Sequence, residues 1–63
     1  MKIRLGGKYE TASGQVVLIT RRLSGVWETW AGIVGFREQW FGEDGNYYYD
    51  GSFSVLNLVR EHK

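Results

Sequence analysis

Residues 37–50 read Arg37-Glu38-Gln39-Trp40-Phe41-Gly42-Glu43-Asp44-Gly45-Asn46-Tyr47-Tyr48-Tyr49-Asp50. An Asp-Gly pair between two aromatic segments is a strong hairpin signal, because glycine accepts the positive φ that tight turns require. The stretch therefore predicts two antiparallel strands on either side of this turn. With Asp44 and Gly45 as the loop, Phe41 would face Tyr48 and Trp40 would face Tyr49, on opposite faces of the ribbon.

The rest of the chain repeats this pattern of short segments separated by glycine. The segments are rich in Val, Ile, Thr, Tyr, Trp and Phe, which is typical of strands joined by tight turns. Glycines inside a strand mark a bulge or a bend, so Gly32 and Gly35 predict a strongly bent strand. The predicted strands are residues 8–11, 15–22, 26–36, 37–41, 46–50 and 53–59, with further turns at Ser13-Gly14 and Asp50-Gly51 and a frayed end at 60–63.

The length of 63 residues allows one domain, spanning 1–63. The chain has no Cys and no Pro, and its ten aromatic residues exclude a disordered composition. We predict an all-β fold, a small five- or six-stranded antiparallel rolled sheet or barrel of the SH3-like kind. An OB-like barrel and a meander completed by a second subunit are the alternatives.

Most of the large rings must be buried in so small a protein. We expect three of them in the core, namely Trp40 or Phe41, Tyr47 or Tyr49, and one of Trp27 and Trp30. Because side chains alternate along a strand, three consecutive tyrosines cannot all point inward. The run Val16 to Ile19 shows no alternation, so the sequence leaves open which of its faces is buried.

Catalytic and metal sites have little support in the sequence. The single His62 stands beside charged neighbours near the end of the chain, and no Cys is present, so no zinc site is expected. Glu43 and Asp44 lie in a predicted turn, and Gly6-Gly7-Lys8 lacks the spacing of a phosphate-binding loop. We predict a protein that is not an enzyme, with no cofactor. The longest apolar runs are far too short to span a membrane, which favours a cytoplasmic protein.

The excess of aromatic residues indicates a contact surface. Exposed Tyr, Trp and Arg are the residues that most often anchor protein interfaces. A surface that carries some of these side chains would contact a protein, either a second copy in a homodimer or a host protein. The candidate contact residues are Trp27, Trp30, Arg37 and Tyr48.

A nucleic-acid-binding barrel is the alternative, because the charges are distributed unevenly. Residues 1–22 hold five cations and one anion, a balance of +4, whereas residues 23–50 have a balance of −4. A basic N-terminal hairpin could track phosphates through Lys8, Arg21 and Arg22. The rings fall mostly in the acidic segment, however, so the protein surface is the favoured interpretation.

Several short stretches form a pattern along the chain, namely Gly7-Lys8-Tyr9-Glu10-Thr11, Gln39 to Tyr48, Asp50-Gly51, Ser54 and Leu58-Val59. In these residues the chain resembles a group of small, uncharacterised phage and prophage proteins. Those proteins carry a Trp, a turn ending in Asn-Gly or Asp-Gly, an aromatic residue and later Asp-Leu-Val. The resemblance implies a phage or prophage origin and a compact β fold, and it implies no activity. Phe41 stands where the family's Trp would align, and Asn57 where its Asp would stand.

Overall fold

Five strands form the frame of the protein in the computed structural model, which describes residues 1–62. Within those residues no segment is helical, so no helix is present that could cross a membrane. The strands are β1 (Lys8–Thr11), β2 (Val16–Arg22), β3 (Glu28–Val34), β4 (Arg37–Gly42) and β5 (Leu58–Glu61).

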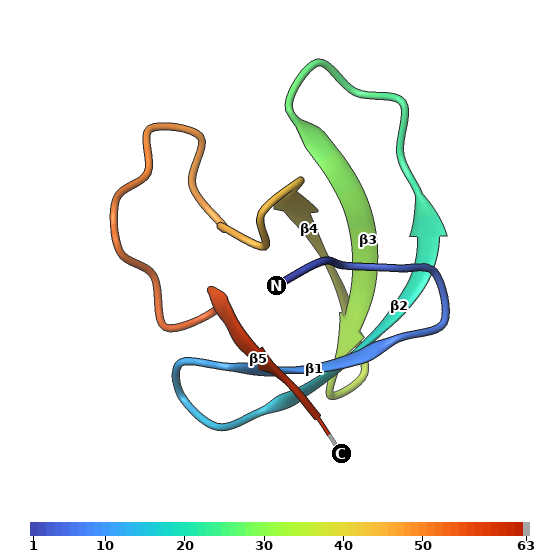
Figure 1. The fold of residues 1–63 in the computed structure, drawn as a ribbon, viewed down its shortest axis with the longest axis vertical. Coiled ribbons are helices and arrows are strands. Elements are labelled where there is room, and N and C mark those ends of the chain that lie inside the picture. Colours follow the sequence, from blue (N-terminus) through green and yellow to red (C-terminus); the bar gives the residue numbers. More distant parts are fainter. Residues whose placement is uncertain (63) are drawn as a thin grey trace.

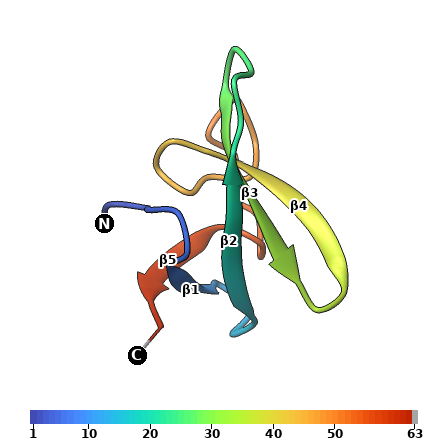
Figure 2. The same cartoon turned by 90° about the vertical axis from the view of Figure 1, so that its right-hand side faces the viewer.

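All strand pairs are antiparallel and belong to one open sheet with the order β4-β3-β2-β1-β5. Figure 2 shows the sheet curling, with β1 and β5 on one side of β2 and with β3 and β4 on the other. Strands β1 to β4 form a meander, and the fifth strand, β5, returns beside β1, which is an arrangement of the SH3-like kind. The predicted all-β, five-stranded rolled sheet is therefore confirmed.

Bulges and glycine give the sheet its curvature. The register shifts between Ile19 and Arg21 in β2 and again between Glu28 and Trp30 in β3. A bulge bends its strand and increases the local twist, which rolls a short sheet toward a barrel. Figure 1 shows β3 as a long curved strand, in agreement with the predicted bend. The strand is shorter than predicted, because Gly35 has a φ of 66° and forms the turn to β4.

The core lies inside the roll and follows the alternation of the strands. Tyr9, Val17, Ile19 and Phe41 are almost completely buried, while Val16 and Leu18 point outward. Val17 and Ile19 therefore form the buried face of residues 16–19, a choice that the sequence alone does not decide. The remaining members of the core are Ile3, Trp30, Val34 and Leu58, with Tyr47 and Leu56 packed against it.

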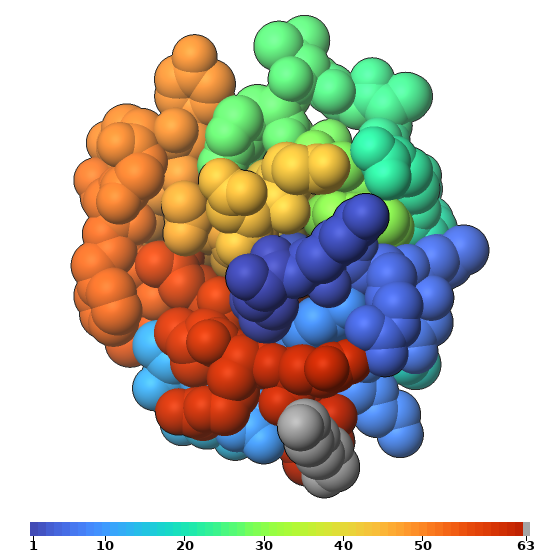
Figure 3. Space-filling model, viewed as in Figure 1, coloured from blue at the N-terminus to red at the C-terminus, as the bar shows by residue number. Residues whose placement is uncertain are grey.

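The N-terminal segment also contributes to the core, although no strand is predicted there. It crosses the middle of the face seen in Figures 1 and 3 and buries Ile3. The Tyr9 hydroxyl holds it in place, because it accepts a hydrogen bond from the Arg4 amide at 2.9 Å and donates to the Lys2 carbonyl at 3.2 Å. Tyr9 thus fills the core with its ring and fastens the segment with its polar tip.

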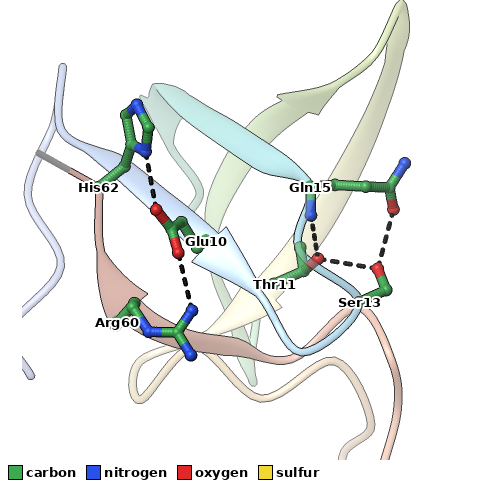
Figure 4. A network of polar contacts seen from close by, with 6 residues as sticks. All are labelled: Glu10, Thr11, Ser13, Gln15, Arg60 and His62. Carbon is green, nitrogen blue, oxygen red and sulfur yellow. Dashed lines mark hydrogen bonds and ion pairs between the residues drawn. The ribbon is translucent and has the colours of Figure 1, made fainter.

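Strand β5 is attached to β1 by side-chain contacts as well as by the sheet. Arg60 Nη1 donates to Glu10 Oε1 at 2.7 Å, and His62 Nδ1 lies 2.8 Å from Glu10 Oε2, as Figure 4 shows. The hydrogen bond from His62 and then that from Arg60 lower the pKa of Glu10. At the turn between β1 and β2, Figure 4 also shows the Thr11 hydroxyl bonded to Ser13 and to the Gln15 amide, within the predicted hairpin.

The strand predicted at 46–50 is wrong. The chain does turn at Gly45, whose amide donates to the Gly42 carbonyl at 3.0 Å, but the next residues form no ladder with β4. The predicted ring pairs are wrong for the same reason. Phe41 contacts Tyr47 rather than Tyr48, and Tyr49 contacts Trp27 rather than Trp40.

The closing strand is also placed differently. Residues 53–57 are irregular, and the strand begins only at Leu58 and continues through Arg60 and Glu61, which the sequence had assigned to a frayed end. The ion pair of Arg4 with Glu61 and that of Glu10 with Arg60 help to order this end. Lys63 lies outside the described residues. The predicted turn at Asp50-Gly51 is present, with the Gly51 amide bonded to the Tyr48 carbonyl.

Candidate functional site

The irregular segment 46–57 forms a loop that is fastened at its base. The Tyr47 amide donates to Asn57 Oδ1 at 2.9 Å, and the Leu58 amide donates to the Gly45 carbonyl at 3.0 Å. Figure 1 shows this loop projecting to one side of the sheet, beyond the ends of β4 and β5. Because both ends are tied together, the rings on the loop have a fixed point of attachment.

Tyr47 anchors the start of the loop to the sheet. Its ring packs edge-on against the buried Phe41, with centroids 6.1 Å apart, and its hydroxyl donates to Gln39 Oε1 at 3.0 Å. Tyr48 in turn packs edge-on against Tyr47 at 5.2 Å. A buried ring thus supports a half-buried one, which supports a third that is 48% exposed.

Trp27 connects the loop between β2 and β3 to the loop 46–57. Its ring meets the ring of Tyr49 edge-on at 5.8 Å. The indole also lies directly on the backbone of Gly42, where a Cβ atom would be 2.5 Å from Trp27 Cζ2. Only glycine permits this close approach. Figure 3 shows the orange loop along one side of the molecule, with its upper part near the green loop at the top.

Trp40 extends these rings onto the outer face of β4. It is 49% exposed, and its indole Nε1 donates to Glu38 Oε1 at 3.1 Å. Arg21 forms a two-point contact with the same carboxylate, at 3.1 Å to Oε2 and 3.0 Å to Oε1. The hydrogen bond from Arg21, followed by that from Trp40, lowers the pKa of Glu38. We call the set Trp27, Trp40, Tyr47, Tyr48 and Tyr49 the aromatic surface.

Three hollows lie along the aromatic surface. The first, of about 370 Å³, is lined by Glu28, Glu38, Gln39, Trp40 and Tyr47. A second, of about 420 Å³, lies between Tyr48, Tyr49, Asp50 and Ser52. A third, of about 250 Å³, shares Glu28 and Trp40 with the first and extends to Arg21 and Leu23.

The predicted contact residues are only partly brought together. Trp27 and Tyr48 both belong to the aromatic surface. Trp30 is only 5% exposed, so it is a core residue and presents no free ring. Arg37 is exposed, but it starts β4 beside Val34, at the end of the strand opposite to Gly42 and Trp27. The aromatic surface therefore forms without Trp30 and Arg37.

The residues of the alternative site are largely neutralised by carboxylates. Arg21 is paired with Glu38, and Arg22 lies 4.0 Å from Glu43 and 4.8 Å above the Trp30 ring. Lys8 is the member of this set with no ion pair among residues 1–62. The fold thus sets the basic N-terminal segment against the acidic middle segment.

Sequence reasoning missed Trp40, Tyr47 and Tyr49 as members of the aromatic surface, and it missed Glu28 and Gln39 as lining of the first hollow. Tyr49 was expected to face Trp40 within a hairpin, and nothing in the local pattern marks Glu28 or Gln39. Their role depends on the register between β3 and β4, which sets Glu28 opposite Gly42. The glycine directly after the two rings of residues 40–41 was the available signal, because a glycine in a strand often marks a close approach.

Within residues 1–62, His, Asp and Glu side chains form no group of three that could hold a metal ion. No protein-family model, no curated protein and no solved structure matches this chain. The resemblance to phage and prophage proteins stays a prediction.

Proposed function

We propose that this protein is a non-catalytic binding module built on a small β-barrel, and that it contacts another protein through the aromatic surface. The partner is either a second copy of the chain or a different protein. The observation that supports this proposal most directly is the joining of rings from two separate loops, through Trp27 on Gly42 and Tyr49, into one exposed surface.

The way the surface is supported favours recognition over simple coverage of the core. Tyr49 is 77% exposed and Phe53 on the same loop is 72% exposed, so these rings shield little of the interior. Rigid rings lose little conformational entropy on binding, and they are enriched among the anchors of interfaces. Tyr47 and Asn57 hold the loop in place before any partner arrives, which lowers the cost of ordering it.

The charges support a protein partner over a nucleic acid. A groove for single strands needs rings and cations together. Here the rings lie beside Glu28 and Glu38, and Arg21, which lines a hollow with Trp40, is already paired with Glu38.

The test compares two variants that remove exposed rings at different places. Tyr49→Ala with Phe53→Ala strips the loop, whereas Phe36→Ala removes a ring that is 94% exposed in the turn between β3 and β4. Sedimentation velocity of the pure protein shows whether the partner is a second copy. A foreign partner is measured by surface binding of the purified pair.

We expect the double variant to weaken association at least ~30-fold, as loss of two interface anchors does, with an unchanged circular dichroism spectrum. Phe36→Ala should retain association within about twofold. Equal losses in the two variants, or no loss in either, would contradict the proposal.

A further inference from the structure

The hollow of about 370 Å³ beside Trp40 combines rings with carboxylates. Its volume stands near the lower limit of the roughly 300–1,000 Å³ that ligand pockets occupy, which suits a single side chain. Trp40 and Tyr47 supply aromatic faces and edges, and Glu28, Glu38 and Gln39 supply polar atoms. It lies within the aromatic surface, so an inference about its ligand rests on the proposed function.

The two carboxylates of this hollow, those of Glu28 and Glu38, are acceptors. Gln39 Oε1 already accepts a hydrogen bond from Tyr47, and Glu38 accepts from Arg21 and Trp40. Glu28 differs from both, because no Lys, Arg or His within residues 1–62 forms an ion pair with it. The carboxylate of Glu28 is therefore the group that remains open to a donor from outside.

The protein already contains the two contacts that such a donor would make. Arg22 stacks over the ring of Trp30 at 4.8 Å, and Arg21 forms a two-point contact with the carboxylate of Glu38. A guanidinium is planar, weakly hydrated and able to form both contacts at once, whereas an ammonium offers a single point of charge. Trp40 next to Glu28 provides the same combination of ring and carboxylate, here without an internal partner.

We propose that this hollow receives an arginine side chain from a flexible segment of a different protein. The guanidinium stacks against Trp40 and pairs with the Glu28 carboxylate, while the surrounding rings of the aromatic surface contact the rest of the segment. An anionic group is repelled by the two carboxylates, and an apolar group would cover Glu28 without satisfying it. Charge complementarity therefore favours a cationic side chain, and stacking on the Trp40 ring favours a planar one.

The probe is a short Gly/Ser peptide with one central arginine, titrated into the ¹⁵N-labelled protein. Matched peptides carry lysine or the uncharged isostere citrulline at that position. We expect roughly millimolar binding of the arginine peptide, with shifts of the Trp40 indole N–H, weaker binding of lysine and none of citrulline.

Glu28→Gln should weaken the arginine peptide about fivefold, the value of one partly shielded charge pair. Trp40→Leu should weaken it about fivefold through the lost ring. The matched control is Glu43→Gln, which removes the same charge from the turn after β4 and should change binding less than twofold. Glu28 has no internal partner to lose, so its variant stays folded even if Trp40→Leu does not.

Equal binding of all three peptides, or equal losses in Glu28→Gln and Glu43→Gln, would overturn the inference. If the pure protein self-associates and Arg37→Gln abolishes this self-association, the arginine comes from a second copy. That result would overturn the proposal that a different protein supplies it. If the arginine peptide fails to bind while Tyr49→Ala with Phe53→Ala still weakens partner binding as expected, the inference is wrong and the proposed function stands. If the arginine peptide fails to bind and the double variant also leaves partner binding unchanged, the inference and the proposed function are both wrong.

Discussion

Two glycine turns flank β4, and they lead to different structures. The turn at Gly35 closes a hairpin at once, since Val34 and Arg37 on either side of it are already paired. The turn at Gly45 also reverses the chain, but twelve irregular residues, 46–57, follow it before β5 begins. The Asn46 carbonyl still accepts a hydrogen bond from the Gly42 amide at 2.9 Å, but the chain then leaves β4, and the Tyr47 amide donates to Asn57 Oδ1 instead.

A turn residue therefore reverses the chain, but it does not determine which strand the next segment pairs with. After Gly35 the side chains of β4 alternate between the core and the outer face, with Phe41 pointing inward and Trp40 outward. After Gly45 the ring of Tyr47 is drawn onto Phe41 and its hydroxyl onto Gln39, so the chain leaves the edge of β4.

The largest expected effect comes from exchanging the two turn glycines for alanine. Gly45→Ala should destabilise the protein by about 2–3 kcal/mol, because the backbone is left-handed with a φ of 89° and the new Cβ would lie 2.9 Å from Leu58 Cβ. Gly35→Ala meets no atom within 4 Å and should cost only about 1–2 kcal/mol for its positive φ. Urea unfolding measures both. A Gly35 variant that is the less stable would refute the idea that the Gly45 turn is locked by packing.

A smaller effect is expected from untying the base of the loop. Asn57→Ala removes the acceptor of the Tyr47 amide and should cost about 1 kcal/mol. Hydrogen exchange at residues 46–56 should accelerate, while amides of the hairpin between β3 and β4 keep their protection. Asn57→Asp retains an acceptor oxygen and should restore slow exchange. Unchanged exchange at Tyr47 in the alanine variant would show that the loop is held by its rings alone.

The smallest effect is expected at β5, the strand that follows the loop 46–57, where the Glu10 side chain attaches β5 to β1. Because its pKa in the folded protein is lowered from the usual 4.5, its ionised form stabilises the fold above that pH. This stabilisation is lost as the pH falls from 4.5 through the lowered value. Glu10→Gln should therefore lower the melting temperature slightly at pH 7. The gap to the wild type should narrow as the pH falls below 4.5, and a gap that stays constant or widens would argue against this role.

Much of the fold could be predicted because it depends on local signals. The hairpin at Ser13-Gly14 and the strands predicted at residues 8–11 and 15–22 follow from turn chemistry and β-type composition. The number of rings that a small core can hold predicted that one of Trp40 and Phe41, and one of Trp27 and Trp30, would be buried, and the structure selects Phe41 and Trp30. The path of residues 46–57 could not be predicted, because Asn57 and Gln39 capture Tyr47 from distant positions in the sequence.

The candidate site was predicted in outline only. Exposed rings near Trp27 and Tyr48 were expected, and both residues lie on the aromatic surface. Arg37 was grouped with them because exposed arginine often anchors protein interfaces, but strand direction takes it to the opposite end of β4. Glu28 becomes relevant only through its register with Gly42, a pairing that composition does not reveal.

The attachment of β5 has a consequence for the order of folding. The pairings among β1 to β4 close short loops, whereas the contact between Glu10 and Arg60 joins residues 50 positions apart. Closing a long loop costs more entropy, so this pairing gains most once the meander is already formed. We expect β5 to dock late on the folding pathway. Contacts around Glu10 would then govern the unfolding rate far more than the folding rate.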